Sequence, residues 1–138
     1  MPADIVVDSG PIIALFDLGD PYHERAKQFV RGSQRTLIST IAVLTEAMYV
    51  LQRNLTARKN LLDWVQRGAV ALRDPTVSDF PRIAELLEKY ADLPMDFTDA
   101  VVVALCERLG TNRVASVDRD FSIYRFKGRT KFVNVFFP

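Results

Sequence analysis

The chain has 138 residues, which is long enough for one domain with a complete hydrophobic core and too short for two. Hydrophobic residues make up 49% of it and the formal net charge is +1, so the composition indicates a globular protein and the overall charge gives no sign of nucleic-acid binding. The single cysteine, Cys106, excludes an internal disulfide and a zinc site made of several thiolates.

No repeat, low-complexity segment or linker divides the sequence, and we expect a single domain over residues 1–138. The N-terminal residues lack the pattern of a secretory signal, and no apolar run is long enough to span a membrane. We therefore expect an intracellular, cytoplasmic protein.

Strand patterns and helix patterns alternate along the chain. Residues 5–7 are uniformly apolar, as in a buried strand, and a short helix is expected from about Pro11. A second helix is expected to begin at Asp20 as its N-cap, with Pro21 in the first turn. Helices are predicted over residues 20–32, 39–54, 56–68, 76–93 and 95–110, and strands over 35–40, 69–72, 113–118 and 131–136.

Strands that alternate with helices pair in parallel through right-handed crossovers. We therefore expect an α/β fold: a three-layer α/β/α sandwich around a mostly parallel sheet of about five strands. In such sheets, ligands bind beyond the carboxyl ends of the strands, where the strand order reverses.

Two aspartates are predicted at that edge of the sheet. Asp8 follows the first apolar strand directly, and Asp118 ends the strand over residues 113–118. If these two strands are neighbours, both carboxylates emerge side by side. Glu46 lies in a helix that is apolar nearly all round, and Asp99 lies in the first turn of another apolar helix.

Four such acids with no basic residue beside them in the sequence would repel one another and resist ionisation. A divalent cation resolves this conflict, because carboxylate oxygens suit Mg²⁺ or Mn²⁺. Simpler explanations stay open for three of them. Asp8 would cap the short helix together with Ser9, Asp99 would pair with Asp96 in a capping arrangement, and Asp118 would be a turn residue.

Four segments in order, "IVVDSGPIIALF", "TEAMYVL", "DLPMDFTDAVVVALCERLG" and "VASVDRDFSIYR", resemble the PIN-domain nucleases. The resemblance extends over nearly the whole chain and is greatest to the VapC-type ribonuclease toxins of toxin–antitoxin pairs. The family's catalytic, metal-binding acids fall on Asp8, Glu46, Asp99 and Asp118. Ser116 stands where the family usually has threonine, Asp96 matches a common second acid, and Ser9 lies next to the quartet; these three are expected to support it.

The resemblance implies Mg²⁺- or Mn²⁺-dependent hydrolysis of RNA, a cognate antitoxin protein and a homodimer. Asp8 and Asp99 are expected as the principal metal ligands. His23, the only histidine, is expected to be solvated, which leaves no histidine as general base. Tyr49 and Trp64, in the third and fourth predicted helices, are candidates for contact with a partner and equally for the core, and the core is favoured for Trp64.

Basic residues alternate with aromatic ones near the C-terminus. Arg125, Lys127, Arg129 and Lys131 lie between Tyr124, Phe126 and Phe132. Such a stripe would bind phosphates while the rings stack on unpaired bases. An edge strand protected by lysines explains the same pattern.

Other functions stay open. A phosphatase with an aspartate nucleophile would want a second acid where Gly10 stands, and a phosphate-accepting, Mg²⁺-binding signalling module would want a second acid closer to Asp8 than Asp4. A non-catalytic binding protein of this type would have lost one of the four acids. A housekeeping RNA-processing nuclease is the alternative to a toxin.

Overall fold

The computed structural model describes residues 4–137 and is built around a five-stranded parallel sheet. The strands occur in the spatial order β3-β2-β1-β4-β7, and every pairing between neighbours is parallel. Their bounds are Ile5–Val7 for β1, Leu37–Ser39 for β2, Ala71–Leu72 for β3, Arg113–Ala115 for β4 and Val133–Asn134 for β7. The expected parallel sheet of about five strands is confirmed.

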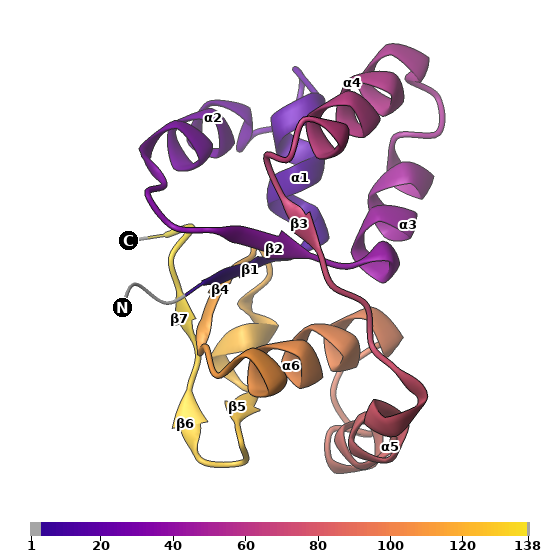
Figure 1. The fold of residues 1–138 in the computed structure, drawn as a ribbon, viewed down its shortest axis with the longest axis vertical. Coiled ribbons are helices and arrows are strands. Elements are labelled where there is room, and N and C mark those ends of the chain that lie inside the picture. The colour runs from indigo at the N-terminus through magenta and orange to yellow at the C-terminus, as the bar shows by residue number, and fades with distance from the viewer. Residues whose placement is uncertain (1–3, 138) are drawn as a thin grey trace.

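Helices cover both faces of the sheet (Figure 1). On one face lie α1 (Ser9–Phe16), α2 (His23–Gly32), α3 (Ile41–Val50) and α4 (Leu55–Gln66). On the other lie α5 (Phe80–Lys89), which a short 3₁₀ helix over Val77–Asp79 precedes, and α6 (Phe97–Leu109). This is the three-layer α/β/α arrangement that the sequence predicts.

The core lies on both faces of the central strands. Val6 in β1 and Val114 in β4 are completely buried, because helices pack above and below them. On the face of the sheet covered by α5 and α6, helix α6 buries more apolar side chains than α5. Its Val101, Val102 and Val103 are all at 0% exposure. It packs against β1, against α5 and against a C-terminal hairpin, which explains why its sequence is apolar on almost every side.

The start of α2 differs from the prediction. The helix begins at His23, and Asp20 lies upstream of it in a turn, where its Oδ1 accepts a hydrogen bond from the Tyr22 N–H at 2.8 Å. His23 is not simply solvated either. Its ring is half-buried, and Nδ1 lies 2.7 Å from the carbonyl oxygen of Ala14 in α1, so it ties the two helices together.

Helix α3 is buried on one side only, although its sequence is apolar nearly all round. Ile41, Tyr49 and Val50 are between 49% and 70% exposed. Its N-terminus is capped from outside the helix, because Asp74 Oδ1 accepts hydrogen bonds from the Ile41 N–H and the Thr40 hydroxyl. Trp64 is half-buried at the margin of the core instead of enclosed in it, with its ring 5.6 Å from that of Phe16 in α1.

The C-terminal segment contains an antiparallel hairpin that the sequence pattern does not predict. It consists of β5 (Arg125–Phe126) and β6 (Thr130–Lys131), and its turn has positive φ at Lys127 and Gly128. The hairpin precedes β7, which forms the predicted edge strand.

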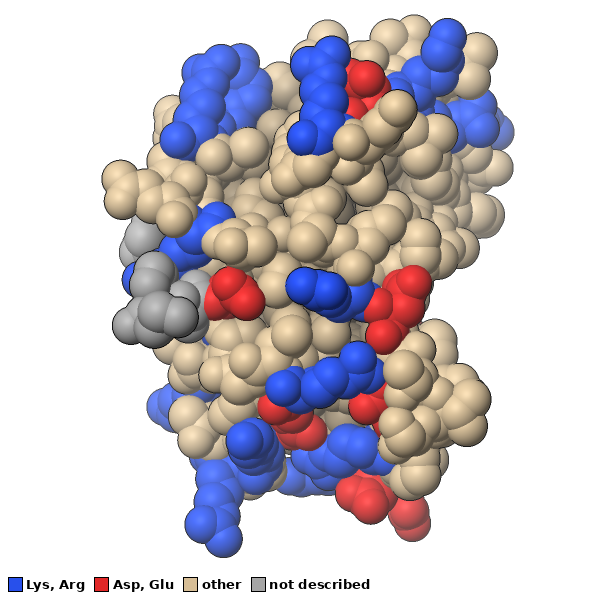
Figure 2. Space-filling model, in the orientation of Figure 1, with Lys and Arg blue, Asp and Glu red and all other residues tan. Residues whose placement is uncertain are grey.

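Surface charge on the face seen in Figure 2 is mixed, with acidic side chains between the Lys and Arg side chains in the lower half. Among residues 4–137, no helix has the length and apolar character needed to cross a membrane.

Gly10 lies in the first turn of α1, close to Val117 in the segment that follows β4. A Cβ built on Gly10 would lie 2.2 Å from Val117 Cγ2, closer than real Cβ contacts come. We expect Gly10→Ala to lower the free energy of unfolding by about 1–3 kcal/mol, because Val117 has to move. Urea unfolding measures this.

Gly32→Ala is the matched control for Gly10→Ala, since nothing lies within 4 Å of a Cβ at Gly32 at the end of α2. It is expected to leave stability unchanged or to raise it slightly. Equal effects of the two substitutions would contradict the assigned contact.

Candidate active site

The site is built where the strand order reverses, between β1 and β4. Val7 pairs with Ala115, and the Asp8 N–H donates to the Ala115 carbonyl oxygen at 2.9 Å, which continues the ladder one residue beyond the strand. Residues that follow β1 and β4 therefore leave the sheet side by side, as the sequence predicts for neighbouring strands.

Asp8 is buried, at 6% exposure, and its side chain does not cap α1. Its Oδ2 instead accepts a hydrogen bond from the Ser116 hydroxyl, at 3.1 Å. The Ser116 oxygen in turn accepts the Asp118 N–H at 3.0 Å. The capping explanation for Asp8 is therefore wrong, and one serine hydroxyl links the carboxylate after β1 to the backbone after β4.

Glu46 comes to the same edge from α3. Its Oε1 accepts a hydrogen bond from the Ser9 hydroxyl at 2.7 Å, and Ser9 is the buried first residue of α1. The hydroxyl next to Asp8 thus holds Glu46, although the two acids are 38 positions apart in the sequence.

Asp99 combines two roles at the start of α6. Asp96 Oδ1 accepts the Asp99 N–H at 2.8 Å, and Asp99 Oδ2 accepts the Asp96 N–H at 3.3 Å, so the capping arrangement considered from the sequence is present. Asp99 Oδ2 also accepts a hydrogen bond from the Tyr124 hydroxyl at 3.1 Å. The Asp99 carboxylate is only 8% exposed, and its Oδ1 has no hydrogen-bond partner among residues 4–137.

Asp118 is more exposed than Asp8 or Asp99 and serves as a cap. Its Oδ1 accepts the Asp120 N–H at 3.0 Å and begins a 3₁₀ helix over Arg119–Ser122. The turn explanation is therefore correct for the backbone around Asp118. It does not separate Asp118 from the other acids, because the Asp118 charge still acts on Asp8.

Burial and the charges of neighbouring acids raise the pKa values of Asp8 and Asp99. The pKa of Asp8 rises from about 3.8 to about 6, first because of burial and then because of the charges of Glu46 and Asp118. The pKa of Asp99 rises to about 7, through burial and the charges of Asp96 and Asp8. No ion pair joins Asp8, Glu46, Asp99 or Asp118 to a lysine or arginine in the described part of the chain.

The donor set fits a hard divalent cation, although the side chains do not already converge on one point. Within residues 4–137, no three His, Cys, Asp or Glu side chains form a group that could hold a metal ion. Mg²⁺ usually keeps several waters and binds through one or two carboxylates, so it does not need such a cage. Buried carboxylates with raised pKa values and no cationic partner are the chemistry that a divalent ion stabilises.

Sequence reasoning missed the role of Tyr124, which it treated as a ring for stacking on bases. The side chain is completely buried, and its hydroxyl is engaged with Asp99. No short-range pattern could have revealed this, since the partner lies 25 positions away. Phe126 and Phe132 are half-buried and pack against each other, with ring centroids 6.2 Å apart.

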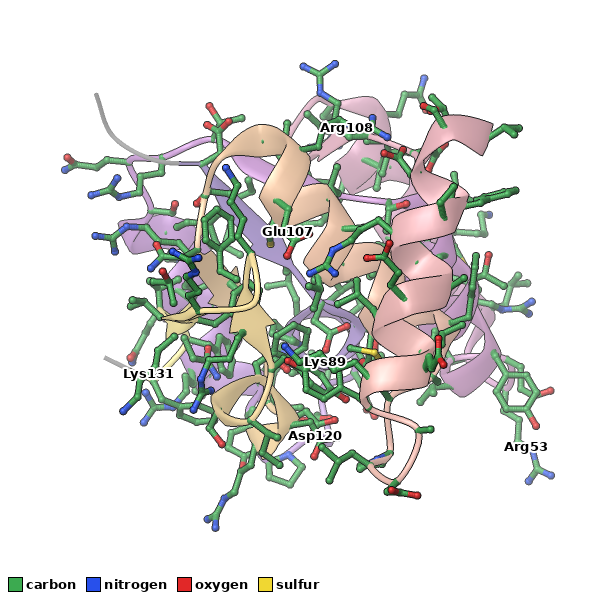
Figure 3. All side chains as sticks on the ribbon, turned by 90° about the horizontal axis from the view of Figure 1, so that it is seen from below. Arg53, Lys89, Glu107, Arg108, Asp120 and Lys131 are labelled. Atoms are coloured by element: carbon green, nitrogen blue, oxygen red, sulfur yellow. The ribbon has the colours of Figure 1, made fainter. Side chains whose placement is uncertain are left out.

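The basic stripe lies on the β5–β6 hairpin, away from the acids. The Lys127 N–H donates to Glu107 Oε2 near the C-terminal end of α6, whereas Asp99 lies in that helix's first turn. Figure 3 shows Glu107 facing α5 and Lys131 on the outer side of the hairpin. The guanidinium of Arg125 donates to three backbone carbonyls, and Arg129 and Lys131 are exposed.

Comparisons with known proteins identify the family and the fold. The PIN domain family matches residues 5–127. Ribonuclease VapC26 of Mycobacterium tuberculosis is 25% identical over 131 residues, which cover 93% of this chain and 97% of that protein. The crystal structure of Mycobacterium tuberculosis VapC20, a sarcin-ricin loop cleaving toxin, has a similar fold, with a TM-score of 0.79 at 24% identity over 86% of this chain and 93% of that one.

The raised pKa values predict how stability depends on pH without metal. Between about pH 4 and pH 7 the folded protein holds protons on Asp99 and Asp8 that the unfolded chain has lost, so the free energy of unfolding falls as pH rises through this window. We expect Asp99→Asn to reduce this fall and to raise the free energy of unfolding at pH 8 by about 1–3 kcal/mol, with little difference near pH 4.

Urea unfolding in chelator at several pH values measures the effect. Asp63→Asn is the control, because Asp63 is exposed on α4 and paired with Arg67, and it is expected to keep the wild-type pH dependence. If Asp99→Asn instead lowered the free energy of unfolding at pH 8, the ionised Asp99 carboxylate would not destabilise the folded protein, and the prediction would be wrong.

Proposed function

Because the chain belongs to the PIN domain family, we propose that it is a metal-dependent endoribonuclease that hydrolyses phosphodiester bonds of single-stranded RNA. The observation that carries the proposal is the group of four acids at the strand-order reversal, where Asp8 and Asp99 are buried and have raised pKa values. A merely structural role gives no reason to bury two carboxylates with no basic partner.

Each acid has a place in the proposed reaction. Asp8 and Asp99 would be the principal ligands for Mg²⁺ or Mn²⁺, and Glu46 and Asp118 would complete the site. A bound ion supplies activation of a water and neutralisation of charge on the phosphoryl group. Asp99 is suited to its part because Tyr124 and the Asp96 N–H occupy Oδ2 and leave Oδ1 available.

Hydroxyl groups hold the carboxylates in place. Ser116 orients Asp8, Ser9 orients Glu46 and Tyr124 orients Asp99. Such partners limit the rotation of each carboxylate. The hydroxyls of Ser116 and Tyr124 also favour the ionised forms of Asp8 and Asp99 by donating to them. His23 takes no part, since its Nδ1 contacts the Ala14 carbonyl between α1 and α2.

We infer that this ribonuclease is the toxin of a toxin–antitoxin pair rather than a housekeeping RNA-processing enzyme. Its similarity to Ribonuclease VapC26 over 93% of the chain supports the toxin assignment. The proposal includes a cognate antitoxin protein and a cytoplasmic site of action. A growth arrest on expression, relieved by a small protein encoded next to this chain, would distinguish the toxin from the housekeeping enzyme.

The cleavage assay tests the proposed function. Purified protein is incubated with mixed single-stranded RNA in Mg²⁺, in Mn²⁺ and in chelator. We expect cleavage only with metal, and a loss of at least about 100-fold in Asp8→Asn and Asp99→Asn, because each substitution removes a ligand charge.

Asp63→Asn on α4 is the control and is expected to cleave like the wild type. Equal cleavage by wild type and both active-site variants would mean that the acids are not catalytic. If metal binds in calorimetry and no RNA is cleaved, the Mg²⁺-binding signalling or binding module becomes the better explanation.

We also propose a homodimer that uses the exposed apolar side of α3 and α4. Tyr49, Val50, Leu55 and Leu62 lie on these two consecutive helices and are between 54% and 70% exposed, and exposed apolar side chains of this kind are typical of an interface. We expect light scattering to give a dimer mass for the wild type and a monomer for Tyr49→Lys combined with Val50→Lys.

Leu18→Lys is the matched control for the dimer, because Leu18 is 82% exposed in the loop after α1. It is expected to stay dimeric. A wild-type monomer at micromolar concentration, or a dimer that survives the double substitution, would contradict this interface.

A further inference from the structure

A pocket of about 420 Å³ opens beside Asp118, on the β4–β7 side of the four acids. Its volume falls within the range of about 300–1,000 Å³ that is typical of small-molecule sites. The loop before α2, the 3₁₀ helix over Arg119–Ser122, β7 and the C-terminal residues contribute to its walls. These segments come from distant parts of the sequence, and none of them belongs to the metal site except Asp118 itself.

Aromatic rings form much of the pocket. Tyr22 and Phe137 stand with their ring centroids 5.6 Å apart at an interplanar angle of 74°, and they are 38% and 40% exposed. Phe121 is buried beneath the pocket, and its ring is 5.7 Å from that of Phe132. Two rings of this size that remain partly exposed in one hollow offer π faces to a planar ligand.

Positive charge lies at the same place. The guanidinium of Arg119 lines the pocket, is exposed and has no ion-pair or hydrogen-bond partner in the part of the chain that the structure describes. The Arg25 guanidinium lies 5.1 Å from the Phe137 ring centroid, so a second cation borders the rings. Planar rings next to the Arg119 guanidinium match a ligand with both a planar ring system and a negative charge.

We propose that this pocket holds one nucleobase of the single-stranded RNA substrate, stacked on the face of one of the two exposed rings, Tyr22 or Phe137, and meeting the other edge-on, while Arg119 contacts the adjoining phosphate. This inference rests on the proposed nuclease function, because the chain that enters the pocket must pass Asp118 and the other acids. The pocket thereby fixes the position of the RNA relative to the catalytic edge. It recognises bases by stacking, which tolerates any base sequence.

Two short probes test the base-binding pocket in chelator, so that no cleavage occurs. One is fluorescein-labelled oligouridine, and the other is an abasic ribose-phosphate chain of the same length. We expect Tyr22→Leu and Phe137→Leu each to weaken oligouridine binding by about tenfold, because each removes a ring that contacts the base. Binding of the abasic chain is expected to stay unchanged, because that chain has no base to contact the ring.

Arg119→Gln is expected to weaken binding of both probes equally, since it removes a phosphate contact. Phe80→Leu and Arg53→Gln are the matched controls. Phe80 is 49% exposed at the start of α5, Arg53 is exposed beyond α3, and neither lines the pocket. Both control variants are expected to bind the two probes like the wild type.

The proposal is overturned if the ring variants bind oligouridine like the wild type, if they lose both probes equally, or if the wild type does not bind oligouridine. Unchanged RNA binding would also result if the pocket receives a side chain of a protein partner. Thermal unfolding checks that each variant is folded.

Cleavage assays distinguish a failure of the proposed base pocket from a failure of the proposed nuclease function. Metal-dependent cleavage with a KM unchanged in the ring variants would leave the nuclease function standing without the pocket. The opposite outcome is that Tyr22→Leu and Phe137→Leu lose the binding that depends on the base, while no metal supports cleavage. That result would establish a single-stranded RNA site and contradict the nuclease function.

Discussion

The parallel pairing of β1 with β4 is the constraint on which the candidate site depends. The register that sets Val7 opposite Ala115 brings the Asp8 N–H onto the Ala115 carbonyl and leaves the Ser116 hydroxyl facing the Asp8 carboxylate. A shift of one residue would turn these side chains to opposite faces of the sheet. Because the strand order reverses here, the connections that follow the two strands diverge and leave the edge open for α3 and α6 to bring in Glu46 and Asp99.

Burial gives these acids their character. Helix α6 is held by completely buried valines, so the first turn that carries Asp99 has little freedom to move toward water. Asp99 and Asp8 consequently have raised pKa values, and the folded protein is less stable at neutral pH than the same fold with neutral side chains would be. Functional sites commonly combine such local instability with a rigid surrounding core, and a cation would offset it.

Capping and function are compatible at the same residue. Asp99 takes part in a capping box and still presents a carboxylate oxygen without a protein partner, and Asp118 caps a 3₁₀ helix beside the proposed base pocket. Asp8 differs from these two, because its side chain accepts a hydrogen bond from Ser116 and makes no capping hydrogen bond at the start of α1. The hypothesis that each acid is either a cap or a ligand was therefore too simple for Asp99 and Asp118.

The sequence by itself determined the α/β class, the parallel sheet and the edge at which Asp8 and Asp118 emerge, and it singled out the four acids as candidates. These follow from local periodicity and from the topology that alternating strands and helices impose. Only the tertiary structure decided that Tyr124 bonds to Asp99, that Asp74 caps α3, that one side of α3 is exposed, and that Tyr22 and Phe137 enclose a pocket. Each of these depends on side chains that are distant in the sequence and meet through packing, and no local pattern encodes such a meeting.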